Sequence, residues 1–136
     1  MFMEMAPDFG DIHTIEWDGP EEDVIVLDRT FTSMSFDSFY WVPTYGDWLR
    51  EFDQAPAYRE LREWLQALQF QDASRDGKSW VLKSPHHLTA VETVLDTFPS
   101  CKIVMTHRSP TQAVPSYASM VCPISSQYSD DVRPLE

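Results

Sequence analysis

The sequence predicts an α/β domain in which parallel strands alternate with flanking helices, behind a mainly helical N-terminal half. Two short segments carry this prediction, because each has a basic residue followed by Ser and Pro, at residues 83–85 and 108–110. Each segment follows an apolar, strand-like run, residues 80–82 and 103–105, and precedes a helix-like stretch. Ser followed by Pro favours a helix start, with Ser as the N-cap and Pro at the first helical position. The chain therefore predicts two successive strand–turn–helix units with a cation at the end of each strand.

Length and composition predict a single domain over residues 1–136. The chain is 43% hydrophobic, which is enough apolar material for one core in a protein of this size. Within the domain we expect a mainly helical part at residues 1–77. A strand–helix–strand–helix part follows at residues 78–120, and residues 121–136 form a tail without a clear periodicity.

The helical part contains three predicted helices. Pro20 followed by three acids predicts a helix over residues 20–30, since carboxylates in a first turn face the positive end of the helix dipole. A short helix is expected over residues 43–52. The strongest helical pattern begins at Pro56 and ends near residue 73. Its apolar side chains recur at steps of three and four residues: Tyr58, Leu61, Leu65 and Leu68.

Residues 31–42, between the first two of these helices, are predicted to form a loop or broken helix. A run of aromatic residues begins in this stretch and continues into the second helix. It has two interpretations, which the sequence leaves open. The rings form the core where the helical half packs on the sheet, or they line a pocket for an apolar acceptor molecule. The residues concerned are Phe36, Phe39, Tyr40, Trp41, Tyr45 and Trp48.

The second half is predicted to hold strands over residues 79–83 and 101–107 and helices over residues 85–98 and 110–120. Gln112 follows Ser109 by three residues, which completes a capping-box pattern at the start of the last helix.

Charge is unevenly distributed along the chain. The net charge of −12 argues against nucleic acid and anionic membranes as partners. Residues 1–77 hold 17 of the 22 acids, whereas residues 78–120 hold four Lys or Arg, three His and only two acids. The carboxyl ends of parallel strands are where ligands bind, and the free N–H groups of helix starts favour anions. The basic segment therefore predicts a site for phosphate or sulfate.

No metal site is predicted. The chain has two cysteines without metal-type spacing, and we expect Cys101, at the start of a strand, to be a buried or half-buried thiol. The histidine spacing also fits no standard zinc site. The four histidines are His13, His86, His87 and His107.

The N-terminus lacks the basic and apolar regions of a signal peptide. The uncharged stretch at residues 110–129 contains three prolines, which argues against a membrane span. We therefore expect a cytoplasmic protein.

The residues that together favour an anion site are one lysine, two histidines, one arginine and one serine. Arginine can hold a phosphate by two parallel hydrogen bonds, and a hydroxyl adds a neutral donor to a terminal phosphate oxygen. The set is Lys83, His86, His87, Arg108 and Ser116.

The motifs around these residues resemble the middle of a bacterial-type sulfotransferase. The resemblance is carried by residues 80–88, 98–99 and 106–110 together with Ser116, and it extends over roughly residues 20–120. These enzymes use 3′-phosphoadenosine 5′-phosphosulfate (PAPS) as sulfuryl donor. The resemblance implies a partial P-loop-NTPase-like fold and transfer of a sulfuryl group from PAPS to a hydroxyl of a small, apolar acceptor.

The resemblance also implies roles for individual residues. Arg108 and Ser116 would hold the 3′-phosphate of the nucleotide, and Lys83 would neutralise charge on the bridging and leaving oxygens. A histidine at the first helix start would take the hydroxyl proton, because its ordinary pKa near 6.5 suits that task. Similarity to the family's recurrent histidine favours His87, whereas the base position of cytosolic sulfotransferases points nearer to His86. A purely structural role beside the helix start remains the alternative for either.

Two departures from the family pattern qualify these expectations. Ser109 stands where relatives often have Asp. Family enzymes also carry a Gly/Ser/Thr-rich loop around the phosphosulfate, whereas glycine occurs here only at positions 10, 19, 46 and 77. We therefore expect a central fragment of the fold that is inactive alone.

Two other functions stay open. One is an inactive relative that binds a nucleotide or partner. The other is a kinase-like phosphotransferase, although the sequence has no Walker A lysine.

Overall fold

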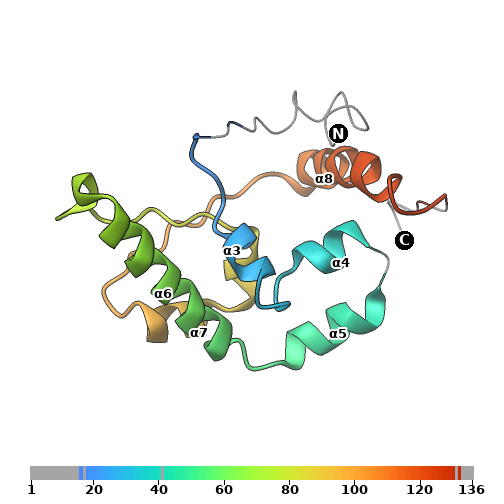
Figure 1. The fold of residues 1–136 in the computed structure, drawn as a ribbon. Helices are drawn as coiled ribbons and strands as arrows, with labels where there is room; N and C mark the ends of the chain where they lie inside the picture. Colours follow the sequence, from blue (N-terminus) through green and yellow to red (C-terminus); the bar gives the residue numbers. More distant parts are fainter. Residues whose placement is uncertain (1–15, 17, 41, 131, 133–136) are drawn as a thin grey trace. The chain divides into compact units, whose positions relative to one another are not determined.

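The computed structural model describes residues 16, 18–40, 42–130 and 132, and it divides into two compact parts (Figure 1). We call residues 22–37 and 42–102 the central part. The α8 part comprises the described residues among 1–21, 38–41 and 103–136. The single domain predicted over the whole chain stays a prediction.

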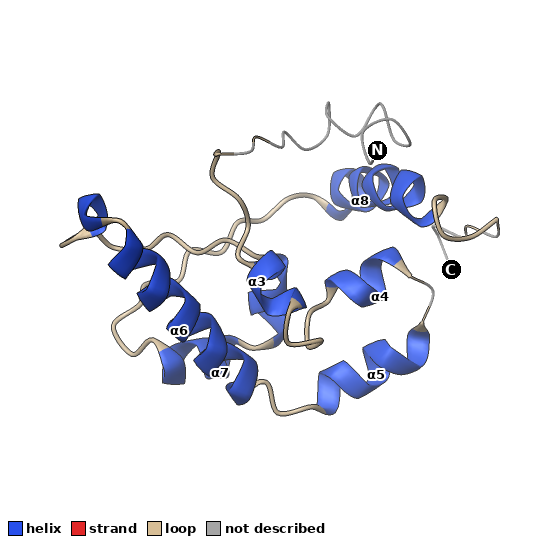
Figure 2. Ribbon diagram, viewed as in Figure 1, coloured by secondary structure: helices blue, strands red, loops and turns tan. Residues whose placement is uncertain are grey.

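The central part is built from short helices around one long helix (Figures 1 and 2). In chain order these are α3 (Val24–Asp28), α4 (Ser35–Phe39), α5 (Pro43–Glu51), α6 (Ala55–Gln71) and α7 (Val91–Thr97), with 3₁₀ turns η1 (Ala73–Arg75) and η2 (Pro85–Thr89). The last two residues of α4 belong to the α8 part, whose own helix is α8 (Pro110–Ser125).

The predicted helices over residues 43–52 and 56–73 are confirmed. The ends of the other predicted helices differ from the predicted ends. α5 and α6 lie within a residue or two of their predicted bounds, and each has a proline in its first turn. The first helix is shorter than expected, because α3 begins only at Val24 and the three acids precede it. The predicted helix over residues 85–98 is two elements, η2 and α7, which meet at Ala90.

The two Ser-Pro helix starts differ in how they are capped. The Ser84 side chain accepts a hydrogen bond from the His86 N–H, as predicted for an N-cap. The Ser109 side chain makes no capping hydrogen bond to α8 and lies instead 2.8 Å from the Thr111 hydroxyl. The capping box predicted with Gln112 is therefore not formed.

The strands predicted over residues 79–83 and 101–107 are not confirmed, because no strand occurs among the residues that the structure describes (Figure 2). A strand is stabilised by backbone hydrogen bonds to a neighbour. The Lys83 N–H donates to the Asp23 side chain instead. Val81 is 91% exposed and Val104 86% exposed. The apolar residues that predicted buried strands thus lie at the surface.

Cys101 shares this exposure. The expectation that its thiol is buried or half-buried is wrong, since the residue is exposed. That expectation depended on a covering sheet, which the described residues do not form.

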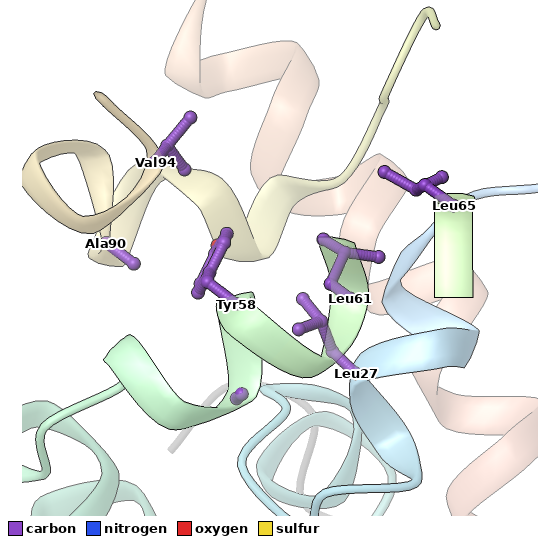
Figure 3. Packing of buried hydrophobic residues seen from close by; sticks show 7 residues of the cluster. Leu27, Tyr58, Leu61, Leu65, Ala90 and Val94 are labelled. Carbon is purple, nitrogen blue, oxygen red and sulfur yellow. The ribbon is translucent and has the colours of Figure 1, made fainter. Parts of the chain in front are cut away.

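The core lies where α6 packs against α3 and α7 (Figure 3). The predicted apolar face of α6 supplies Tyr58, Leu61 and Leu65, whereas Leu68 is 37% exposed. The spacing of these residues explains why one face of α6 is buried. The cluster comprises Leu27, Ala57, Tyr58, Leu61, Leu65, Ala90 and Val94.

The aromatic run contributes no member to this buried cluster. In the central part Phe36, Tyr45 and Trp48 form a chain of ring contacts with centroids 5.8 and 5.5 Å apart. Trp48 is 42% exposed. Trp41 lies outside the described residues. The interpretation of this run as the core is therefore wrong for its described members in the central part.

The α8 part is organised around the C-terminal half of α8. Ile124 is buried against Phe39 and Met120, and the Ser125 hydroxyl donates to the Phe39 carbonyl at 3.2 Å. α8 continues five residues beyond the predicted end at residue 120, despite the prolines at 115 and 123 within it.

The core position of Leu61 yields a first prediction. Leu61 is 1% exposed, so Leu61→Ala should lower the free energy of unfolding by about 2–5 kcal/mol through lost burial and a residual cavity. Leu88→Ala is the matched control, because Leu88 is 62% exposed and should change stability by less than about 0.5 kcal/mol. Urea unfolding measures both, and equal losses in the two variants would contradict the observed core.

Candidate functional site

The predicted Lys83–His87 segment lies in the central part, where Ser84 sets its local conformation. The Ser84 side chain accepts from the His86 N–H, and Pro85 opens the 3₁₀ turn η2. Both histidines lie in this turn, which follows the extended residue Ser84. The lysine and the histidines are therefore close together because they are neighbours in the sequence.

His86 is fully buried, and both of its ring nitrogens are hydrogen-bonded. Its Nδ1 accepts from the Met34 N–H at 3.2 Å. Nε2 must then carry the hydrogen, and it donates to Gln54 Oε1 at 2.6 Å. Burial, reinforced by the neighbouring His87, lowers the pKa of His86 to about 4. His86 is thus held as a neutral imidazole that fastens η2 to the residues before α4 and α6.

His87 is held between two helices and stays partly accessible. Its side chain is 20% exposed. Its Nε2 lies 2.9 Å from Asp23 Oδ2 at the start of α3, and its Nδ1 lies 2.8 Å from the Tyr58 hydroxyl on α6. Burial, followed by the charge of Asp23, raises the pKa of the Tyr58 phenol well above its ordinary value. Tyr58 therefore stays protonated and donates to Nδ1.

Asp23 connects the histidine to the lysine. Its Oδ1 accepts the Lys83 backbone N–H at 2.7 Å, while Oδ2 faces His87. The Lys83 ammonium pairs with Glu22 Oε1 at 2.5 Å. The lysine side chain is 77% exposed, so water screens this pair. Two consecutive acids before α3 thus contact the predicted site residues.

Arg108 and Ser116 belong to the α8 part and are exposed. Arg108 lies two residues before α8, and no described residue forms an ion pair with it. Ser116 lies in the second turn of α8, where its carbonyl accepts the Ser119 hydroxyl at 2.8 Å. That Lys83 and Arg108 share one ligand-binding edge stays a prediction.

Among the described residues, no group of three or more His, Cys, Asp or Glu gathers as a metal site would require. Nor does any described helix combine the length and the apolar character that a membrane span needs.

The partners of the histidines could not be predicted from the sequence. Asp23 was interpreted as a helix-start charge and Tyr58 as a core residue, and Gln54 carried no signal. Asp23 and His87 are 64 positions apart, so no local pattern could join them. A lone buried carboxylate partner for a histidine is visible only after folding.

A family model described as "Sulfotransferase family" matches residues 3–136. This family suggests a P-loop-like α/β fold, whose parallel strands are not confirmed in the described residues. No curated protein and no solved structure matches the chain.

The buried state of His86 predicts an acid-sensitive fold. The unfolded chain takes up a proton near pH 6.5, whereas folded His86 does so only near pH 4. Acidification between these values therefore favours unfolding, and the contribution of His86 to stability falls by roughly 3 kcal/mol as the pH drops to about 4. Well above pH 6.5 both states hold His86 neutral, and His86 then contributes no pH dependence.

Chemical denaturation between about pH 7 and pH 4 measures this effect. His86→Asn removes the titrating group, and its side-chain oxygen can still accept from the Met34 N–H. The loss of stability on acidification should be smaller in this variant than in the wild type. An equal loss of stability with falling pH in the wild type and in His86→Asn would show that His86 is not a buried, neutral group.

Proposed function

The chain belongs to the sulfotransferase family, and we propose that it carries residues of a site that transfers a sulfuryl group from PAPS to a hydroxyl of a small, apolar acceptor. The family match over residues 3–136 is the observation that carries this proposal. The contacts around His87 and Lys83 support it and give each residue a task.

His87 is proposed as the general base. Of the two histidines in η2 it is the one with an accessible side chain, whereas His86 is fully buried and has both nitrogens engaged. The acceptor hydroxyl oxygen forms a bond to sulfur while the bond from sulfur to the nucleotide phosphate oxygen breaks, and the hydroxyl proton passes to His87. A positioned base of this kind contributes about 100- to 10,000-fold to the rate.

The proton would be accepted at Nδ1. The Asp23 carboxylate can only accept hydrogen bonds, so the nitrogen facing it carries the hydrogen and Nδ1 is left with the lone pair. Tyr58 now donates to that lone pair. The acceptor hydroxyl would therefore have to take the place of the Tyr58 phenol at Nδ1 before it gives up its proton.

Lys83 is proposed to neutralise the charge that develops on the leaving phosphate oxygen. Its ammonium is exposed, and its pair with Glu22 is of the screened kind that is worth about 0–1 kcal/mol. An anion of higher charge displaces such a carboxylate readily. In the absence of PAPS, Lys83 thus stays in a weak ion pair with Glu22.

Arg108 and Ser116 are proposed to hold the 3′-phosphate of the donor. The residues fit a phosphate, because the guanidinium has no ionic partner among the described residues and the Ser116 hydroxyl makes no hydrogen bond within them. Arginine binds such a group with two parallel, charge-assisted hydrogen bonds.

The role of Arg108 can be tested by binding. Loss of a charge-assisted hydrogen bond costs about 1.5–3 kcal/mol, so Arg108→Ala should weaken binding of adenosine 3′,5′-bisphosphate at least about tenfold. Titration calorimetry measures the affinity, with Arg62→Ala as the control, since Arg62 is exposed on α6. Equal affinities for wild type and Arg108→Ala would remove Arg108 from the site.

Turnover distinguishes the enzyme from a relative that only binds. Phosphosulfate needs several donors around its oxygens, and no glycine of this sequence lies in a Gly/Ser/Thr-rich loop. We therefore expect the folded 136-residue chain to bind the nucleotide but to transfer no sulfate from labelled PAPS to phenols or alcohols at a useful rate.

Lys83→Ala is the test variant in this assay, and Lys78→Ala is its matched control. Circular dichroism first shows that each variant is folded. Robust turnover that Lys83→Ala abolishes and Lys78→Ala keeps would show that the chain builds its own phosphosulfate site. The expectation of inactivity would then be wrong, and the proposed role of Lys83 would stand.

A further inference from the structure

We propose that Asp23 is the positioning residue of this site: its carboxylate decides which nitrogen of His87 carries the proton and fixes that ring to the backbone of Lys83. The catalytic meaning of this assignment rests on the proposed function. The assignment itself concerns three residues of the central part and is tested separately.

The first observation is that Asp23 does not cap its own helix. It occupies the N-cap position of α3, where aspartate ordinarily accepts from backbone N–H groups of the first turn. Its backbone is helical, with φ −71° and ψ −5°, and its side chain makes no capping hydrogen bond. Both carboxylate oxygens are turned to residues about 60 positions later instead.

The second observation is that the pair is isolated. Asp23 is 8% exposed, and both Asp23 Oδ2 and His87 Nε2 are buried. No hydrogen bond to either atom is formed among the described residues, and the polar atom that each faces at 2.9 Å is the other. A buried carboxylate oxygen without a partner is costly, which makes a proton between these two atoms the favourable arrangement.

These contacts fix the neutral tautomer of His87. Asp23 only accepts, so Nε2 carries the hydrogen, and Tyr58 donates to Nδ1. The orientation of an imidazole by a neighbouring carboxylate is a general device, because the hydrogen bond at one nitrogen decides whether the other nitrogen carries hydrogen. Here it leaves Nδ1 as the atom able to accept a substrate proton.

Replacement of the carboxylate by an amide should reverse the tautomer. The Lys83 N–H needs an acceptor, so in Asp23→Asn the amide oxygen takes the place of Oδ1. The amide NH₂ then faces His87 Nε2, which must give up its hydrogen and accept. His87 becomes the Nδ1–H tautomer, and it donates to the Tyr58 oxygen. The nitrogen proposed as the base is no longer available.

Nitrogen-15 NMR of the histidine rings in the full chain tests this at about pH 8, where an ordinary histidine is neutral. The His87 signals are assigned by their loss in His87→Gln. The wild type should show hydrogen on Nε2, and Asp23→Asn should move it to Nδ1. The control is Asp28→Asn, at the other end of α3, because Asp28 forms no hydrogen bond or ion pair with His87 or Lys83, and this change should leave the tautomer unchanged.

An unchanged tautomer in folded Asp23→Asn overturns the proposal. If that variant does not fold, Tyr58→Phe keeps the test open, because it removes the donor at Nδ1 and leaves Asp23 in place. Asp23 then still holds the hydrogen on Nε2. Movement of the hydrogen to Nδ1 in Tyr58→Phe would assign control to Tyr58 and refute the role of Asp23.

Nucleotide binding separates this outcome from the proposed function. Binding of adenosine 3′,5′-bisphosphate is measured on the wild-type chain, whereas the tautomer of His87 is read without any ligand, so the two results are independent. Failure of the wild type to bind would refute the proposed nucleotide site and leave the tautomer result standing. A tautomer that does not respond to Asp23 would refute the positioning role and leave the nucleotide site standing.

Discussion

The carboxylate of Asp23 links the start of α3 to the segment that carries Lys83 and His87. No strand lies beside Lys83 among the residues that the structure describes, so the Lys83 N–H has no sheet partner there and donates to Asp23 Oδ1. The second oxygen of Asp23 lies 2.9 Å from His87 Nε2, which forms no hydrogen bond within the described residues. The Asp23 side chain therefore accepts the Lys83 N–H in place of a neighbouring strand, and it also faces the imidazole of His87, four residues later. Tyr58 completes the arrangement from α6, where its ring is also part of the apolar core.

The structure depends on such polar contacts because polar side chains are buried in the interior of the central part. The buried set of the central part contains polar residues beside the apolar cluster, among them Asp23, Gln54 and His86. A satisfied hydrogen bond contributes only about 1 kcal/mol to stability, whereas a buried polar group left without a partner costs about 1–3 kcal/mol. The penalty for mispairing is larger than the gain from pairing, so such groups favour one arrangement over others of similar apolar burial. His86 illustrates this, because its Met34 and Gln54 contacts require one tautomer and one ring orientation.

Features that depend on neighbours in the sequence could be predicted, and features that depend on distant partners could not. The face of α6 and the cap at Ser84 are set by spacings of two to four residues, and both are found. The strands were predicted from apolar runs, but a run becomes a strand only beside a partner, and Val81 and Val104 are exposed instead. The lysine and histidines could be located from their motif. Their contacts with Asp23 and Tyr58 join positions 29 to 64 residues apart, which no spacing pattern encodes.

The two parts of the chain offer different kinds of polar group. In the central part the proposed base and lysine already have partners, and His87 is held from two helices. A network of this kind orients groups before a ligand arrives, which suits proton transfer because the geometry needs no reorganisation during the reaction. In the described residues of the α8 part, Arg108 is an exposed cation without an ionic partner. An unpaired guanidinium has no internal bond to break when an anion binds, so its full charge is available for recognition. The two proposed tasks, proton transfer by His87 and phosphate recognition by Arg108, therefore fall to separate sets of residues.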